Sequence, residues 1–170
     1  MSEAHHVLNA LSDAAARQAL ERCCAAHRWL TAMLRQRPFE SAAALFAAAE
    51  QSFAGLGRDD YLEAFAQHPQ IGASLLELRA RFPVTAAWSS EEQASVTHAD
   101  DRTLLALRAA NAEYLARFGH IFIVCASGKT AAEMLSLLEA RLDNAPDVEL
   151  RIAAAEQAKI TRLRLEKLAP

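Results

Sequence analysis

The pentapeptide HPQIG, which runs from His68 to Gly72, places a titratable imidazole beside a proline that stops a helix. The end of a helix favours the charged imidazolium, whereas burial favours the neutral ring. His68 is therefore expected to titrate near neutral pH, as a general acid or base requires. A histidine that only hydrogen-bonds a carbonyl at the helix end would occupy the same position, so the sequence leaves both interpretations open.

A second candidate site is the segment from Ser89 to Gln93, in which Ser89 and Glu92 have the spacing of a capping box. The start of a helix presents backbone N–H groups and stabilises negative charge. It can therefore hold a polar ligand while Glu92 stays ionised, and the Gln93 amide can both donate and accept a hydrogen bond. A box that only caps its helix would have the same sequence.

Arg164 is the third candidate, because it lies on the same predicted helical face as Ile160 and Leu168. A guanidinium on an apolar face needs a partner, since an unpaired buried charge is costly. That partner is a core carboxylate, the C-terminus of a helix, or the carboxylate of a bound ligand. Arg162 falls on the outward face, so the two arginines are not equivalent.

Helical periodicity and capping residues predict the elements that position these side chains. Ser12, Ser41 and Thr130 are expected to cap the starts of helices, and Pro146 suits the first turn of the last helix. Helix ends are expected at Arg37-Pro38, where the pattern that follows Ser12 stops, and at Gly55 and Gly57. Asp59 or Asp60 is expected to start a short helix that reaches His68, and Ser89 to start another. Asp100 and Asp101 are expected to start a longer helix that ends at Phe118 and Gly119.

The apolar run from Ile121 to Cys125 resembles a strand, but the sequence contains no second run to pair with it. We therefore expect a buried extended connector, in which Cys125 is a small buried side chain. With only five glycines, five prolines and no low-complexity linker, residues 1–170 are predicted to form a single domain. The predicted architecture is an all-α bundle of about eight helices.

The composition excludes several classes of protein. Hydrophobic residues make up 52% and charged residues 23% of the 170 residues, which is typical of a globular protein, and the net charge of −3 favours neither a nucleic acid nor a membrane surface as partner. The three cysteines are Cys23, Cys24 and Cys125, which form no disulfide framework, so a cytoplasmic location is expected. No histidine spacing matches a metal site, and no signal peptide is expected at the N-terminus.

Six short motifs follow one another along nearly the whole chain. They are His68-Pro69-x-Ile71-Gly72, Ser89-x-x-Glu92-Gln93, Asn111-x-x-Tyr114 with Phe118-Gly119, Phe122-Ile123-Val124-Cys125-Ala126, Arg141-Leu142 with Asn144, and Lys159-Ile160-x-x-Leu163-Arg164-Leu165. Each motif is weak alone, but the ordered set is specific. Taken together, the motifs resemble those of the OHCU decarboxylases, which act on 2-oxo-4-hydroxy-4-carboxy-5-ureidoimidazoline (OHCU) during the oxidation of urate to allantoin.

The resemblance implies an all-α fold, usually a homodimer, that decarboxylates OHCU to (S)-allantoin without a metal or organic cofactor. It implies that His68 is the catalytic acid or base. We expect Glu92 to be the second catalytic residue, which hydrogen-bonds the substrate hydroxyl and fixes the ring. The residues that the resemblance implies for substrate binding are Pro69, Ser89, Ser90, Glu91, Glu92, Gln93, Phe122, Ile123, Val124, Cys125, Ala126 and Arg164. One departure is visible, because His120-Ile121 stands where the family often has Phe-Pro.

Two other functions stay open on the sequence. The first is a non-catalytic helical bundle that binds a small ligand or a partner helix, although such a module needs no imidazole at His68. The second is a related lyase or hydrolase that acts on another ureido compound, because the shape of the pocket sets the choice of substrate.

Overall fold

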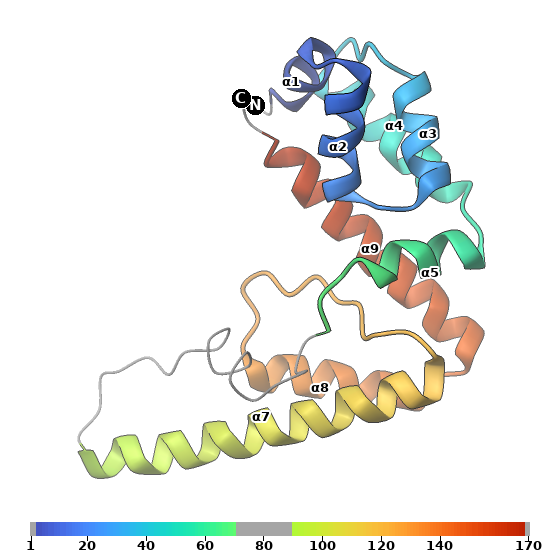
Figure 1. Cartoon of the computed structure of the whole chain (residues 1–170). Helices are drawn as coiled ribbons and strands as arrows, with labels where there is room; N and C mark the ends of the chain where they lie inside the picture. Colours follow the sequence, from blue (N-terminus) through green and yellow to red (C-terminus); the bar gives the residue numbers. More distant parts are fainter. Residues whose placement is uncertain (1–2, 71–89, 169–170) are drawn as a thin grey trace. The chain divides into compact units, whose positions relative to one another are not determined.

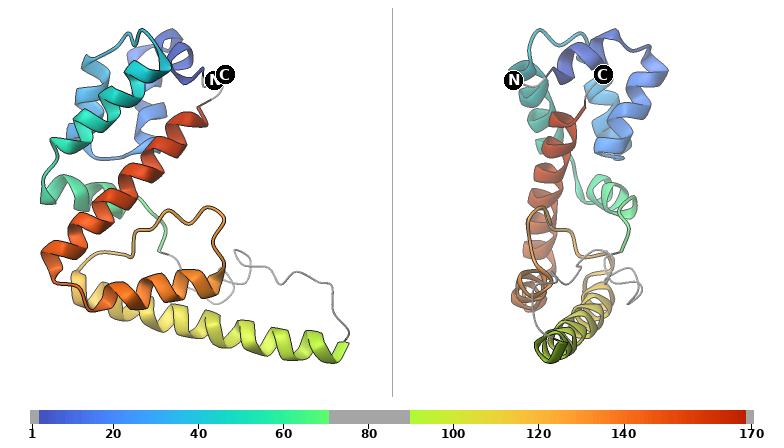
Figure 2. Two further views of the ribbon diagram at one scale, coloured as in Figure 1. Left: turned by 180° about the vertical axis from the view of Figure 1, so that it is seen from behind. Right: turned by 90° about the vertical axis from the view of Figure 1, so that its left-hand side faces the viewer.

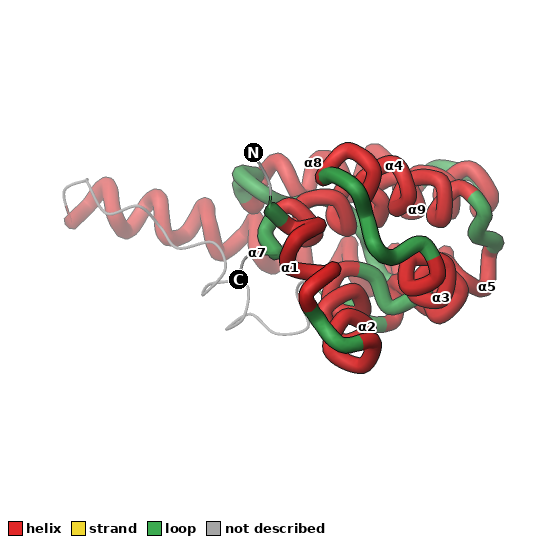
Figure 3. Tube along the Cα trace, turned by 90° about the horizontal axis from the view of Figure 1, so that it is seen from above, coloured by secondary structure: helices red, strands yellow, loops and turns green. Residues whose placement is uncertain are grey.

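The computed structural model describes the backbone of residues 3–70 and 90–168, and the side chains of residues 3–70 and 101–168. Within these ranges the chain forms eight helices and no strand, which confirms the all-α prediction (Figure 3). Contacts divide the chain into two compact units. The first unit holds residues 1–68, 123–125 and 150–170, and the second holds residues 69–122 and 126–149. The assignment of residues 1–170 to a single domain stays a prediction.

The first unit is built around helix α3 (His27–Arg35), which packs against α2 (Asp13–Cys23), α4 (Ala42–Ala54) and α5 (Arg58–Ala66) (Figure 1). Its Trp29 is fully buried and donates its indole N–H to the carbonyl of Ala49 at 3.1 Å. Because an indole N–H needs a partner when buried, this bond fixes α3 against α4. The residues of α9 (Pro146–Glu166) from Leu150 onward also belong to this unit, and they lie beside α4 (Figure 2).

Two of the predicted caps of this unit are confirmed. The Ser12 hydroxyl accepts from the Ala15 N–H at 3.3 Å, and the Ser41 hydroxyl accepts from the Ala44 N–H at 3.1 Å. Helix α5 begins at Arg58, just before the expected position, and the Asp60 carboxylate accepts from the Gly57 N–H at 2.8 Å. The helix ends at Ala66, so His68 lies two residues beyond it.

The sequence analysis missed two features of the first unit. Helix α1 (Ala4–Ala10) was not predicted, because its N-cap Glu3 makes no side-chain capping bond. The helical pattern that follows Ser12 is interrupted after Cys23, where the backbone of Cys24 is extended, and it resumes at His27. The sequence has no local signal for this break. We attribute it to tertiary packing, since Cys24 and Ala26 are both buried.

The second unit contains α7 (Ser90–Phe118) and α8 (Ala131–Leu142), which lie side by side and run in the same direction (Figures 1 and 2). The predicted helix start at Asp100 and Asp101 is wrong, because α7 is one helix of 29 residues. Residues 90–118 contain no glycine or proline. An aspartate inside a helix costs less than about 1 kcal/mol, which is too little to end it.

The chain returns from the end of α7 to the start of α8 through residues 119–130. Gly119 and Gly128 have positive φ angles of 73° and 75°, which glycine adopts without strain. Phe122, Ile123 and Val124 are buried without regular secondary structure, so the prediction of a buried connector in place of a strand is confirmed. At its end, the predicted Thr130 capping box is present, with Glu133 accepting from the Thr130 N–H at 2.7 Å and donating its own N–H to the Thr130 hydroxyl at 3.2 Å.

Candidate functional site

Two buried polar side chains lie on the inner face of α9. Gln157 is 0% exposed and Thr161 is 3% exposed, and they share this face with the buried Ala154 and Leu165. Their side chains are joined, since the Gln157 amide nitrogen donates to the Thr161 hydroxyl at 3.2 Å. The same hydroxyl donates to the Gln157 backbone carbonyl at 2.9 Å. A buried polar pair is stable only when its hydrogen bonds are made, so the remaining amide oxygen also needs a donor.

His68 meets that oxygen. Its Nε2 atom lies 2.6 Å from Oε1 of Gln157, and its backbone N–H donates to the carbonyl of Phe65 at 3.1 Å. The imidazole is half-buried. The ring is thus held by a side-chain amide of α9, whereas only the backbone of His68 bonds a carbonyl at the end of α5.

The surroundings of His68 favour the neutral imidazole. Burial lowers the pKa of His68 below its ordinary value of 6.5, and the positive charge of Arg164 lowers it further. The hydrogen bond with Gln157 acts in the opposite direction without outweighing them. At neutral pH His68 is therefore mostly uncharged, and it can accept a proton.

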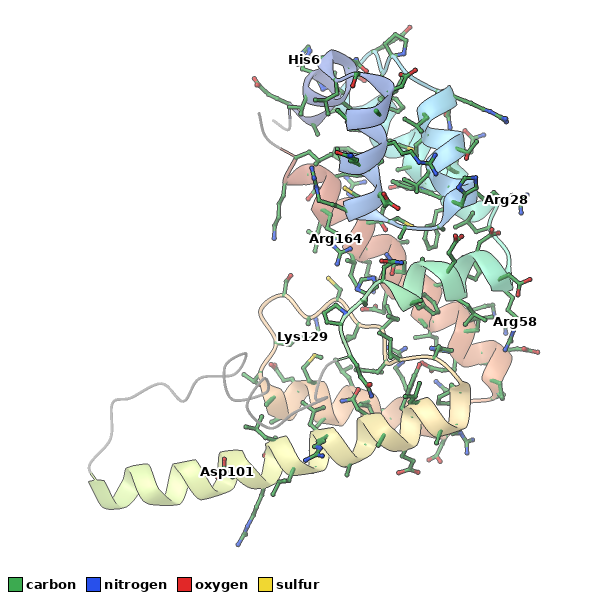
Figure 4. The ribbon with its side chains drawn as sticks, viewed as in Figure 1. His6, Arg28, Arg58, Asp101, Lys129 and Arg164 are labelled. Atoms are coloured by element: carbon green, nitrogen blue, oxygen red, sulfur yellow. The ribbon has the colours of Figure 1, made fainter. Side chains whose placement is uncertain are left out.

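Arg164 is anchored at the C-terminal end of α2, one of the three partners that the sequence left open. Its Nη1 atom donates to the carbonyls of Arg22 and Cys23 at 3.1 and 3.5 Å (Figure 4). The cation stabilises the negative end of that helix. Within the described part of the chain, Nε and Nη2 of Arg164 have no hydrogen-bond acceptor, so they are available to a ligand.

The face of α9 that carries Arg164 is less buried than the spacing predicted. Ile160, Arg164 and Leu168 are half-buried, and the most buried face runs through Gln157, Thr161 and Leu165 instead. The prediction for Arg162 is confirmed, because its guanidinium is exposed and contacts the Glu50 carboxylate at 2.9 Å.

The second predicted binding segment, from Phe122 to Ala126, is also tied to α9. The backbone N–H of Cys125 donates to Oε2 of Glu156 at 2.7 Å, and Oε1 of the same carboxylate accepts from Lys159 at 2.5 Å. Cys125 itself is half-buried, rather than fully buried as expected. Because the side chains of Ile123 and Val124 are buried, these two residues can offer a polar ligand their main-chain groups only.

Several predicted site residues are not placed by these contacts. Ser89 lies outside the described residues, and so does its capping box with Glu92. The residues Ser90, Glu91, Glu92 and Gln93 form the first turn of α7, but their side chains fall outside the described part of the chain. Pro69 is exposed. Of the predicted site residues, the structure brings His68 and Arg164 close together, and the backbone of Cys125 is bonded to Glu156 of the same helix α9 that carries Arg164.

Three residues that help to hold this site were missed by the sequence analysis, namely Glu156, Gln157 and Thr161. A signal for two of them was present. Gln157 and Thr161 are polar residues four positions apart, so they share one apolar face of the last helix, just as Arg164 shares a face with Ile160 and Leu168. The same argument, that a buried polar group needs a partner, applies to them.

Other motif residues form a buried cluster in the second unit. The Glu149 carboxylate is 0% exposed and accepts hydrogen bonds from the Tyr114 hydroxyl, from Nε of Arg141 at 2.8 Å and from the Asn144 amide at 2.8 Å. Burial and the bond to Glu149 raise the pKa of Tyr114 above its ordinary value. Arg141 also lies 4.6 Å from the ring centre of Phe122. These motif residues thus support the fold at one end of the second binding segment.

The described residues contain no group of three or more side chains suited to a metal ion. None of the helices they form is both long and apolar enough to cross a membrane. The imidazole of His68 can transfer a proton, and the guanidinium of Arg164 can bind an anion or an amide oxygen.

Comparisons with known proteins give matches that cover most of this chain. A protein-family model described as OHCU decarboxylase matches residues 9–166. A uric acid degradation bifunctional protein TTL of Arabidopsis thaliana is 41% identical over 150 residues, which are 86% of this chain and 45% of that relative. A 2-oxo-4-hydroxy-4-carboxy-5-ureidoimidazoline decarboxylase of Amia calva is 34% identical over 102 residues, which are 59% of this chain and 57% of that relative.

Among solved structures, a crystal structure described as OHCU decarboxylase in the presence of (S)-allantoin matches with a TM-score of 0.71 and 35% identity. The match covers 92% of this chain and 97% of that one. The chain spans about half the length of the curated relatives it matches.

Proposed function

Because this chain belongs to the OHCU decarboxylase family, we propose that it converts OHCU to (S)-allantoin during the breakdown of urate. The observation that carries the proposal is the placement of His68, a half-buried imidazole with a lowered pKa that is held by Gln157 close to Arg164. An uncharged imidazole near a cation is suited to moving a proton on an anionic substrate.

The chemistry of this substrate requires no electron sink from outside. One ring carbon of OHCU bears both the carboxylate and the hydroxyl, and the neighbouring carbon, which bears the ureido group, forms a C=N bond in the ring. When the bond to carbon dioxide breaks, its electron pair forms a C=C bond between the two carbons. The electrons of the C=N bond then move to the ring nitrogen. The protein has to orient the carboxylate, stabilise the charge and direct protons.

The proton count assigns a role to His68. The product has a C=O in place of the hydroxyl, and it gains a C–H on the ureido carbon and an N–H on the ring nitrogen. These two protons are the hydroxyl proton and one proton from solvent. Neutral His68 would accept the hydroxyl proton and deliver a proton to one face of the ureido carbon, while the ring nitrogen takes the other. Delivery from one face gives a single enantiomer.

The other proposed contacts follow from the charges of the substrate and the family motifs. Arg164 would donate to the ureido or ring carbonyl through Nε and Nη2. Glu92 would hydrogen-bond the hydroxyl and Gln93 a carbonyl of the substrate, as the family motif implies. The segment from Phe122 to Ala126 would contribute main-chain groups, and Glu156 would hold it in place. Pro69 and the residues from Ser89 to Glu91 would also bind the substrate, as the family motifs imply.

The test of this proposal is the handedness of the product. Purified protein is added to freshly generated OHCU, and allantoin is separated on a chiral column. Spontaneous decay should give a racemate, whereas the enzyme should give (S)-allantoin with a faster release of carbon dioxide. A racemate formed at the spontaneous rate would refute the decarboxylase. Tight binding of OHCU without turnover would favour the non-catalytic bundle, and turnover of another ureido compound would favour a related enzyme.

The rate of decarboxylation should fall in acid as His68 becomes protonated. Since the folded pKa of His68 lies below 6.5, kcat/KM should be on its plateau at neutral pH and should fall as the pH drops through that pKa. Replacing Arg164 with glutamine removes a positive charge that lowers this pKa, so the midpoint should move to higher pH.

The measurement is kcat/KM against pH for the wild type and for both arginine variants. Arg162→Gln is the matched control, because it removes a neighbouring but exposed cation of the same helix and should leave the midpoint unchanged. A wild-type midpoint at or above 6.5, or an equal shift in both variants, would contradict the role given to His68 and Arg164.

We propose that the active form is a cytoplasmic homodimer of a single-domain chain that needs no cofactor, as the resemblance implies. Light scattering of the purified chain would measure its mass, and a monomer at the concentration of the assay would refute the dimer. Full activity after dialysis against a chelator is expected, and loss of activity would indicate a metal requirement.

A further inference from the structure

A chain of hydrogen bonds leads from the backbone carbonyl of Gln157 through the Thr161 hydroxyl and the Gln157 side chain to His68. The backbone carbonyl of Gln157 can only accept, so the Thr161 hydroxyl, 2.9 Å away, gives it its single proton. The lone pairs of the hydroxyl then face the side chain of Gln157 at 3.2 Å. The atom that meets them must be a donor, and it is therefore the amide nitrogen.

This arrangement determines which end of the amide faces the imidazole. Because the nitrogen is used by Thr161, the oxygen Oε1 lies at 2.6 Å from Nε2 of His68. An amide oxygen has no proton to give, so the hydrogen bond exists only when Nε2 of His68 carries one. In the neutral ring the other nitrogen, Nδ1, then has the lone pair.

We propose that Gln157 and Thr161 are positioning residues that fix neutral His68 as the Nε2–H tautomer, so that Nδ1 is the atom that accepts the substrate proton. The tautomer follows from the hydrogen bonds alone, whereas its catalytic consequence rests on the proposed function. Burial supports the inference, since Gln157 and Thr161 are 0% and 3% exposed and water is kept from competing for these bonds.

The choice of an amide rather than a carboxylate as the partner of Nε2 has a chemical consequence. A carboxylate would also accept from Nε2–H, but its charge would favour the imidazolium. The neutral oxygen of Gln157 fixes the same tautomer while the ring stays uncharged. His68 therefore keeps a basic Nδ1 at neutral pH, which is the state that proton removal from the substrate hydroxyl requires.

The tautomer is read directly by NMR in the resting protein. The full chain is labelled with ¹⁵N at histidine, and the ring nitrogens are correlated with the ring protons at a pH well above the titration of His68. Comparison with His68→Gln assigns the signals. We expect an N–H-type shift at Nε2 and a lone-pair-type shift at Nδ1. The reverse assignment would overturn the proposal, because Gln157 would then present its nitrogen.

Three variants test the two positioning residues. Thr161→Val removes the hydroxyl at nearly constant volume, which frees the amide to turn, so the two nitrogen shifts of His68 should move toward each other. Thr161→Ser restores the hydroxyl and should restore the wild-type shifts. Gln157→Met removes the acceptor and should abolish the slowly exchanging Nε2–H proton signal.

The same variants should affect turnover in the same order. Gln157→Met is expected to lower kcat by about tenfold or more, since loss of the group that sets a histidine tautomer costs up to about 10⁴-fold in hydrolases with a Ser-His-Asp triad. Thr161→Val should have a smaller effect on kcat, KM should change little in both variants, and Thr161→Ser should be close to wild type. Unchanged shifts and unchanged kcat in Thr161→Val would overturn its role.

The two readouts separate this inference from the proposed function. If the chain forms no (S)-allantoin, the NMR spectra still decide the tautomer. If the chain is active but its spectra show Nδ1–H, the decarboxylase stands and the positioning role of Gln157 fails. A Thr161→Val chain that does not fold leaves the wild-type spectrum and Gln157→Met to decide.

Discussion

Replacing His68 with asparagine is expected to lower kcat for decarboxylation by about 10²- to 10⁴-fold, the range that a positioned acid or base contributes. Asparagine cannot take up the hydroxyl proton at neutral pH. It also has no means to deliver a proton to one face of the ureido carbon, so the excess of (S)-allantoin should disappear. The measurement combines the initial rate on fresh OHCU with chiral analysis of the product.

A second substitution at the same position separates chemistry from packing. His68→Gln places an amide nitrogen near the position of Nε2 and can still donate to Gln157, but it does not titrate. It should be as inactive as His68→Asn while unfolding at a temperature close to that of the wild type. The matched control is His27→Gln, because His27 is an exposed histidine of the same unit whose ring contacts Arg17. It should keep full activity.

Wild-type kcat and enantiomeric excess in a folded His68→Gln variant would remove His68 from the mechanism. Loss of activity in His27→Gln to the same extent would show that the assay reports general damage to the first unit. A rise in KM alone, with kcat preserved, would give His68 a role in substrate binding rather than in proton transfer.

The sequence identified His68 and Arg164 because each has a local signal, a following proline or a place on a partly apolar helical face. It did not identify Gln157, because the partner of His68 lies 89 residues away along the chain. The spacing of Gln157 on an apolar helical face could show that its side chain needs a partner, but it could not show that the packing of α9 makes His68 that partner. The anchoring of Arg164 on the carbonyls of Arg22 and Cys23 has the same origin.

The same distinction explains the outcome for the helices. The caps at Ser12, Ser41 and Thr130 were predicted correctly, since a side chain there bonds a backbone N–H three residues away. The start predicted at Asp100 and Asp101 was wrong, because the acidic pair is also compatible with the interior of a helix. Helix α1 lacks a side-chain capping bond at Glu3, and its buried residues are Ala4 and Leu8, so packing contributes to its stability.

Replacing Glu149 with leucine is expected to lower the free energy of unfolding by about 3–5 kcal/mol, the cost of breaking a buried ion pair by removing one partner. The carboxylate is fully buried and accepts from Tyr114, Arg141 and Asn144, so the substitution deprives three donors of their acceptor at once. Urea denaturation followed by circular dichroism measures the loss as a shift of the midpoint at constant slope.

The double variant Arg141→Met/Glu149→Leu shows whether the loss of stability comes from leaving the Arg141 charge buried without its partner. Replacing both members of a buried ion pair with apolar residues is often neutral, so the double variant should recover most of the stability lost in Glu149→Leu. Arg28→Gln is the control, because it breaks an exposed ion pair with Asp60 and should cost less than about 1 kcal/mol.

A double variant no more stable than Glu149→Leu would assign the loss to packing, and a cost below about 1 kcal/mol in Glu149→Leu would refute the structural role of the cluster. The result bears on function as well, because Arg141 and Tyr114 both contact Phe122 at the start of the second binding segment. If the cluster fixes that segment, Glu149→Leu should raise KM under conditions in which the protein is still folded, and the double variant should not restore it, because it lacks the Arg141 guanidinium.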